Sequence, residues 1–76
     1  MNLTQNDLLV LRGYANNNMN ATQTAHNIFY SRRVVYYHLN AIKKKTGKDP
    51  RNFYELQELL KMFEKGEIDF GRSHSD

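Results

Sequence analysis

Basic, tyrosine and asparagine side chains recur at helical spacing in the middle of this 76-residue chain. At 100° per residue, four of them fall on one side of a helix: Arg33, Tyr37, Asn40 and Lys44. Arginine can pair bidentately with guanine and asparagine with adenine, while tyrosine can reach a phosphate or a thymine methyl group. The residues that we predict to contact base edges in duplex DNA are Arg32, Arg33, Tyr36, Tyr37 and Asn40.

Positive charge is concentrated in the same segment. Between residues 32 and 51 only Asp49 opposes seven cations, whereas acidic residues outnumber basic ones from Glu55 onward. Such an asymmetry indicates an anion-binding surface, although a solvated helix face has the same composition. Helix N-termini also bind phosphates, so Thr22 and Gln23 at the start of the short helix are candidates, with capping of that helix as their alternative role. The predicted phosphate contacts are Thr22, Gln23, Ser31, Lys43, Lys44 and Lys48.

Four helical segments must position these side chains. Thr4 and Asp7 form an approximate capping box before the first helix, which the run of asparagines at 16–18 should end. A short helix should follow from residue 21 or 22 to 29, capped by Asn20. A longer one should run over 32–46, between the cap Ser31 and the left-handed Gly47. The last should begin at 50–52 and continue to about residue 65. The fold class predicted is all-α, a compact four-helix domain.

The apolar positions of these helices predict which sides are buried. The first helix should pack through Leu8, Leu11 and Ala15, broadened by Leu9 and Val10. The short helix should turn Ala25, Ile28 and Phe29 inward, and the 32–46 helix should bury Val35, Leu39 and Ile42. The predicted apolar face of the last helix is Phe53, Leu56, Leu59, Leu60 and Phe63.

The middle pair of helices has features of a helix-turn-helix. Ala25 is small where two crossing helices must approach closely, and the β-branched Val35 follows ten residues later. The stretch from Thr24-Ala25 through Ser31–Leu39 to Ile42 and Thr46-Gly47 resembles the C-terminal helix-turn-helix domain of PucR-type and sugar-diacid-type bacterial regulators. It is more distantly similar to the DNA-binding end of the factor for inversion stimulation. The resemblance covers about residues 5–63 and implies that the recognition helix is 32–46.

Departures from the family pattern leave the DNA target open. Arg33-Val34 stands where the family commonly has Asn-Thr, and Tyr36 and His38 stand where arginines are common. His38, at the edge of the buried stripe, is expected to pack against one of the first two helices. The family domain usually ends a long sensory protein, and this chain reads as standing alone, so no ligand-sensing role is expected from the resemblance.

Composition sets the domain organisation and excludes several functions. We predict one domain over residues 1–66 and a flexible C-terminal tail over 67–76. The chain has no cysteine, and its three histidines have no partners at ligand spacing, so no metal or other cofactor is expected. No apolar run approaches the length of a membrane span, and no small-molecule site is evident. A cytoplasmic, nucleoid-associated location is expected, and no nucleophile–base pair or phosphate-binding glycine loop indicates an enzyme.

The last helix carries more apolar residues than one small core needs: Phe53, Tyr54, Leu56, Leu59, Leu60, Met62 and Phe63. We predict that some of them form a homodimer, whose two-fold symmetry would place two recognition helices about 34 Å apart. Whether the first or the last helix makes the interface stays open. The alternative function is a helical adaptor in a transcription complex, docking an acidic protein with the same basic face.

Overall fold

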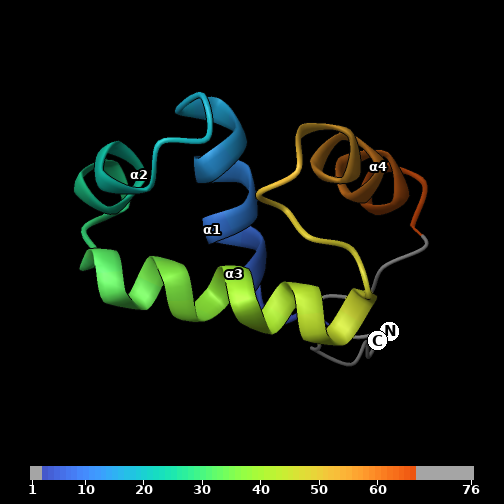
Figure 1. The fold of residues 1–76 in the computed structure, drawn as a ribbon, viewed down its shortest axis with the longest axis horizontal. Coiled ribbons are helices and arrows are strands. Elements are labelled where there is room, and N and C mark those ends of the chain that lie inside the picture. The colour runs from blue at the N-terminus through green and yellow to red at the C-terminus, as the bar shows by residue number, and fades with distance from the viewer. Residues whose placement is uncertain (1–2, 67–76) are drawn as a thin grey trace.

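The computed structural model describes residues 3–66, which form four α-helices (Figure 1). They are α1 (Gln5–Asn16), α2 (Ala21–Ile28), α3 (Arg32–Thr46) and α4 (Phe53–Glu64). Each boundary lies within about three residues of the one predicted, so the all-α fold is confirmed. The predicted tail over 67–76 lies outside the described residues.

The helix starts are fixed by side chains that accept hydrogen bonds from the first turn. Thr4 and Asp7 form a complete capping box, in which each side chain accepts from the other's backbone N–H. The cap of α2 is Asn20, which accepts from the N–H of Gln23 at 2.9 Å. Ser31 and Asn52 cap α3 and α4 in the same way. All four helix starts are therefore encoded locally.

The connections around α2 use left-handed backbone. Helix α1 ends where the run of asparagines predicted, and Asn18 and Met19, which follow it, have φ of 55° and 62°. Gly47, with φ of 75°, ends α3. The two turns that flank α2, at Asn18–Met19 and at the left-handed Phe29, place α1, α2 and α3 so that each packs against the other two.

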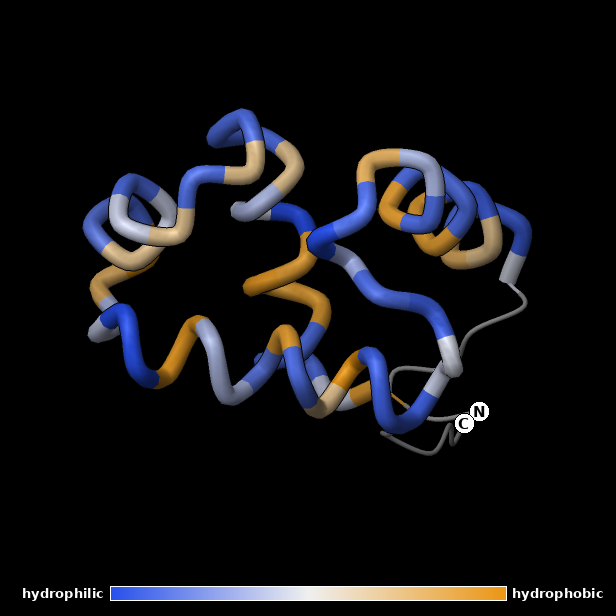
Figure 2. The backbone as a smooth tube through the Cα atoms, viewed as in Figure 1, coloured by the Kyte–Doolittle hydropathy of each residue, from blue (hydrophilic) through white to orange (hydrophobic). Residues whose placement is uncertain are grey.

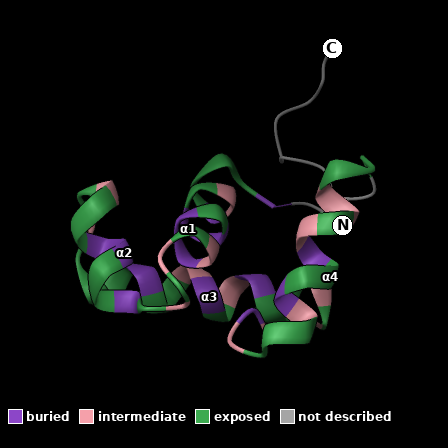
Figure 3. Cartoon of the chain, turned by 90° about the horizontal axis from the view of Figure 1, so that it is seen from above, coloured by how far each residue is buried: buried purple, intermediate pink, exposed green. Residues whose placement is uncertain are grey.

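The core lies between α1, α2 and α3 and extends to the inner face of α4. Its fully covered apolar residues include Val10 and Leu11 of α1, Val35, Leu39 and Ile42 of α3, and Leu56 and Leu59 of α4. Figure 2 shows most apolar positions of α3 along the edge that faces α1, and Figure 3 shows the buried segments on the inner sides of the helices. Leu9, predicted to broaden the α1 face, is instead 43% exposed.

Two small residues permit close approach of α2 to its neighbours. Ala25 is buried, in agreement with its predicted place at the helix crossing. At Gly13, an added Cβ would lie 3.2 Å from the Thr24 methyl and 3.3 Å from a methyl of Ile28, so the backbone of α1 packs directly against side chains of α2 there. The helix-turn-helix unit α2–α3 is thus supported along one side by α1.

The prediction that Phe29 faces inward is wrong. Phe29 is 93% exposed, with φ of 61°, because α2 ends at Ile28 and the left-handed residue turns the chain away. Tyr30 packs against the core instead, and its hydroxyl donates to Asn6 Oδ1 at 3.0 Å. A non-glycine residue in this conformation costs about 1 kcal/mol, which the packing on either side of the turn must offset.

The predicted apolar face of α4 is correct except at its start. Leu56 and Leu59 are buried, and Leu60, Met62 and Phe63 pack partly against the core. Phe53 is 55% exposed and Tyr54 78% exposed, since both lie in the first turn, beyond the reach of the core. The apolar surplus of the last helix is therefore smaller than the sequence indicated.

Candidate nucleic-acid interface

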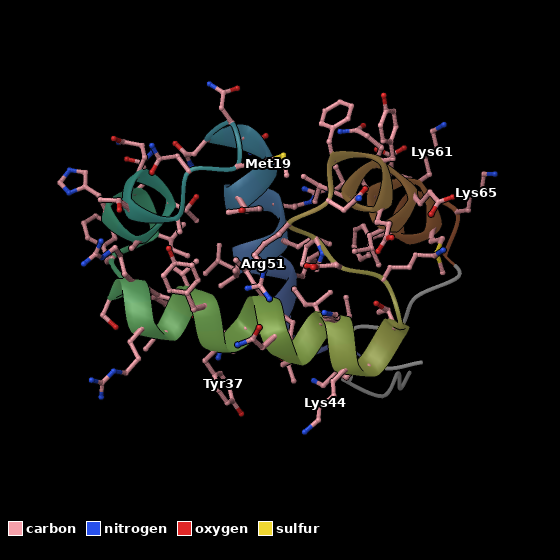
Figure 4. The ribbon with its side chains drawn as sticks, viewed as in Figure 1. Met19, Tyr37, Lys44, Arg51, Lys61 and Lys65 are labelled. Atoms are coloured by element: carbon pink, nitrogen blue, oxygen red, sulfur yellow. The ribbon has the colours of Figure 1, made fainter. Side chains whose placement is uncertain are left out.

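The two sides of α3 differ completely in burial. Val35, Leu39 and Ile42 have no exposed surface. On the opposite side, all four residues of the predicted polar face are exposed: Arg33, Tyr37, Asn40 and Lys44. In Figure 4 the side chains of Tyr37 and Lys44 point away from the body of the protein. We call these four residues the outer face of α3.

The other predicted base-contacting residues flank this face. Tyr36 is 44% exposed, and Arg32 occupies the first helical position after the cap. Among the described residues neither Arg32 nor Arg33 has an ion-pair partner. Positive charge at a helix start is unfavourable with the helix dipole, so two unpaired arginines there suit an anionic partner.

The predicted phosphate contacts differ in their availability. Thr22 and Gln23 are exposed in the first turn of α2, with the Gln23 side chain donating to Asn27 Oδ1 at 3.2 Å. The Ser31 hydroxyl accepts the Val34 N–H at 3.2 Å as the α3 cap. Capping and a phosphate contact are compatible, since a hydroxyl can accept one hydrogen bond and donate another.

Carboxylates partly neutralise the lysines. Lys48 Nζ lies 3.0 Å from Glu58 Oε1, and Lys43 Nζ lies 3.9 Å from Asp49 Oδ2. Lys44 has no such partner within residues 3–66. Asp49 is the only acidic residue between positions 32 and 51, but Asp7 and Glu58 from outside this segment also pair with its lysines. Within residues 3–66 the unpaired charge is concentrated on Arg32, Arg33 and Lys44.

A buried carboxylate ties the start of α1 to α3, and the sequence did not reveal it. Asp7 is 1% exposed. Its carboxylate forms hydrogen bonds with His38 Nδ1 at 2.7 Å and with Lys45 Nζ at 2.6 Å. Burial alone would raise the pKa of Asp7, but hydrogen bonds from Lys45, His38 and the Thr4 backbone outweigh it and hold the pKa below its ordinary value. An ionised carboxylate only accepts, so His38 donates its Nδ1 proton.

The only sequence signal for this cluster is the position of Asp7, three residues before Val10 and four before Leu11, which places an acid on the buried face of α1. The expectation that His38 packs against the first or second helix is confirmed, with α1 as the partner. The cluster joins α3 to α1 through His38 and Lys45, which are not residues of the outer face.

The described residues show no grouping of three or more potential metal ligands. None of the helices in residues 3–66 has the length and apolarity that crossing a membrane requires. The functional groups that α3 exposes are therefore polar or positively charged.

Comparison with known proteins agrees with this geometry. The family model of the PucR C-terminal helix-turn-helix domain matches residues 8–62, a stretch that holds most of α1, all of α2 and α3, and nearly all of α4. No curated protein and no solved structure gives a significant match. The resemblance to the PucR-type C-terminal domain is confirmed, and the match covers most of the chain. The chain belongs to the PucR C-terminal helix-turn-helix domain family, a family of DNA-binding domains of transcription regulators.

Proposed function

We propose that this domain binds duplex DNA sequence-specifically as a bacterial transcriptional regulator, with α3 inserted in the major groove. The observation that carries the proposal is the outer face of α3, which is exposed, polar and positively charged while the opposite face is fully buried. An α-helix fits the width of the major groove, where each base pair presents a distinct pattern of donors and acceptors. Such a role would place the protein at the nucleoid in the cytoplasm.

Separate roles follow from the chemistry of each side chain. Arg32, Arg33, Tyr36, Tyr37 and Asn40 are the candidates for base edges. Lys44 and Lys43 lie in the last part of α3, and Thr22, Gln23, Ser31 and Lys48 lie on other elements; these six suit phosphates. Lys43 and Lys48 would exchange their carboxylate partners for phosphate, which reduces the net gain from each.

The test is a titration of a labelled generic duplex at increasing salt. If the domain neutralises roughly four phosphates, affinity should fall about 100-fold between 50 and 200 mM salt, because counterions are released on binding. Lys44→Ala should lower the salt slope by about 1 without changing sequence preference. Failure to bind at the lowest salt would contradict the proposal and favour the alternative function, a helical adaptor whose basic face docks an acidic protein.

We also propose a homodimer that uses the start of α4. Phe53 and Tyr54 are the exposed part of the apolar surface predicted for this interface, and their rings meet edge-to-face with centroids 5.5 Å apart. A second copy would cover both rings and pair two recognition helices about one helical turn of DNA apart.

Light scattering at tens of micromolar should give twice the protomer mass of 9.0 kDa. The double variant Phe53→Ser/Tyr54→Ser should return the mass to that of one protomer. The matched control is Leu9→Ser, which removes an exposed apolar side chain from a different helix, α1. It should leave the dimer intact. A monomeric mass for the unmodified protein would exclude this dimer.

A further inference from the structure

Arg51 reaches from the connection between α3 and α4 onto the outer face of α3 (Figure 4). Its Nη2 donates to Asn40 Oδ1 at 2.6 Å. The arginine is held on its own side by Asp49, whose Oδ1 accepts the Arg51 N–H at 3.0 Å and lies 3.5 Å from Nε. The preceding Pro50 is buried, which anchors the backbone of the connection. The Arg51 side chain is thus placed by its surroundings and is only one-third exposed.

The positive charge of Arg51 also acts on α1. Burial raises the pKa of Tyr14 on α1, and this charge acts on it in the opposite direction. The contacts that hold the Arg51 side chain are those with Asp49 in the connection and Asn40 on α3. A side chain restrained in this way loses little freedom when it holds a neighbour in one orientation.

The contact determines which hydrogen-bonding group Asn40 can offer. A guanidinium has five donors and no acceptor, so the carboxamide must turn its oxygen toward Arg51. The NH₂ group then points away from the arginine. The bidentate pair with adenine requires both ends of the carboxamide, the oxygen accepting from N6 and the NH₂ donating to N7. With its oxygen turned to Arg51, Asn40 is poorly placed for that pair.

We infer that Arg51 is a positioning residue that makes Asn40 a donor and so directs the middle of α3 to guanine instead of adenine. The Arg51 bond occupies one of the two lone pairs of the Asn40 oxygen, and the groups beside it, the Asn40 NH₂ and the remaining guanidinium N–H groups, are donors. In the major groove guanine presents two adjacent acceptors, N7 and O6, whereas adenine presents N7 beside the donor N6. The inference rests on the proposed function and specifies what the outer face of α3 reads.

The experiment is selection of bound sequences from a random duplex pool with the unmodified protein, Asn40→Ala, Arg51→Ala and the double variant. The unmodified protein should enrich guanine at one position of each site, and Asn40→Ala should flatten that position. Arg51→Ala should release the carboxamide, so that adenine gains on guanine there by about tenfold, within the range of one bidentate contact. In the Asn40→Ala background, removing Arg51 should have no further effect at that position.

Lys44→Ala is the matched control, since it removes one exposed cation of the same outer face. It should weaken binding uniformly and leave every base preference unchanged. If Arg51→Ala behaves like Lys44→Ala, Arg51 acts only as a charge and the inference is overturned. Enrichment of adenine by the unmodified protein at the Asn40-dependent position would overturn it as well.

Arg51→Met keeps the aliphatic stem and removes every donor, so it repeats the test if Arg51→Ala lowers the unfolding temperature. Failure of the unmodified protein to enrich any sequence would count against the proposed function itself. Enrichment of a defined site whose bases do not respond to Arg51→Ala or Arg51→Met would overturn the inference alone.

Discussion

Replacing Asp7 with alanine is expected to lower the free energy of unfolding by about 3 kcal/mol, a large part of the stability of so small a domain. The change removes charge-assisted hydrogen bonds from His38 and Lys45 together with half of the α1 capping box. It also leaves the half-buried His38 without its partner. Urea unfolding followed by circular dichroism at constant pH measures the loss.

Glu58→Ala is the matched control, because it too removes a carboxylate from a lysine, Lys48, at 3.0 Å. The Glu58 side chain is 58% exposed, whereas that of Asp7 is 2% exposed. Solvent screens the Glu58 pair, so its loss should cost less than about 1 kcal/mol. Equal destabilisation by the two variants would show that the buried cluster contributes nothing beyond a surface ion pair.

The same cluster makes stability depend on pH. The pKa of Asp7 is lower in the folded protein than its ordinary value of 3.8. The folded state therefore binds the proton less readily, and the Asp7 contribution is complete above about pH 3.8 and lost as the pH falls through the folded-state pKa. The difference in unfolding free energy between the unmodified protein and Asp7→Ala should shrink as acid is added below that value.

Replacing Arg33 with alanine is expected to weaken specific DNA binding about 10- to 100-fold, the range for one base-reading arginine. The same change should slightly raise the free energy of unfolding. Arg33 is the second residue of α3 and has no ion-pair partner among the described residues, so its removal relieves an unfavourable charge at the helix start. We expect a gain of a few tenths of a kcal/mol in unfolding free energy.

Anisotropy titrations with a selected duplex and with a generic one, alongside thermal unfolding, separate these effects. Arg33→Lys keeps the charge but loses the bidentate geometry, so it should retain non-specific binding while losing most of the preference for the selected duplex. Unchanged affinity for the selected duplex in Arg33→Ala would remove this residue from the base-reading set.

Local features of the chain were readable from its sequence. The caps at Thr4, Asn20 and Ser31, the left-handed Gly47 and the buried stripe of Val35, Leu39 and Ile42 all agree with the structure. Each of them depends on residues within a few positions of one another, and helix capping and periodicity act at that range.

The errors concern contacts between residues distant in sequence. Nothing near Asp7 indicates that His38 and Lys45 converge on it, and nothing near Lys48 indicates its pairing with Glu58. Phe29 was predicted to face inward. It is itself the left-handed residue that ends α2, and this conformation directs its side chain to solvent. The sequence therefore predicted which residues share the exposed face of α3. The unpaired charge of that face, and the hydrogen bond that turns the Asn40 oxygen toward Arg51, depend on tertiary structure.

The length of the outer face of α3 limits how much DNA one protomer can read. Arg33 and Lys44 are eleven residues apart, which corresponds to about 16 Å along the helix axis. Successive base pairs are about 3.4 Å apart, so this distance spans no more than about five base pairs. A regulatory site for the proposed dimer would then consist of two such short blocks, separated by base pairs that no side chain of the outer face reaches.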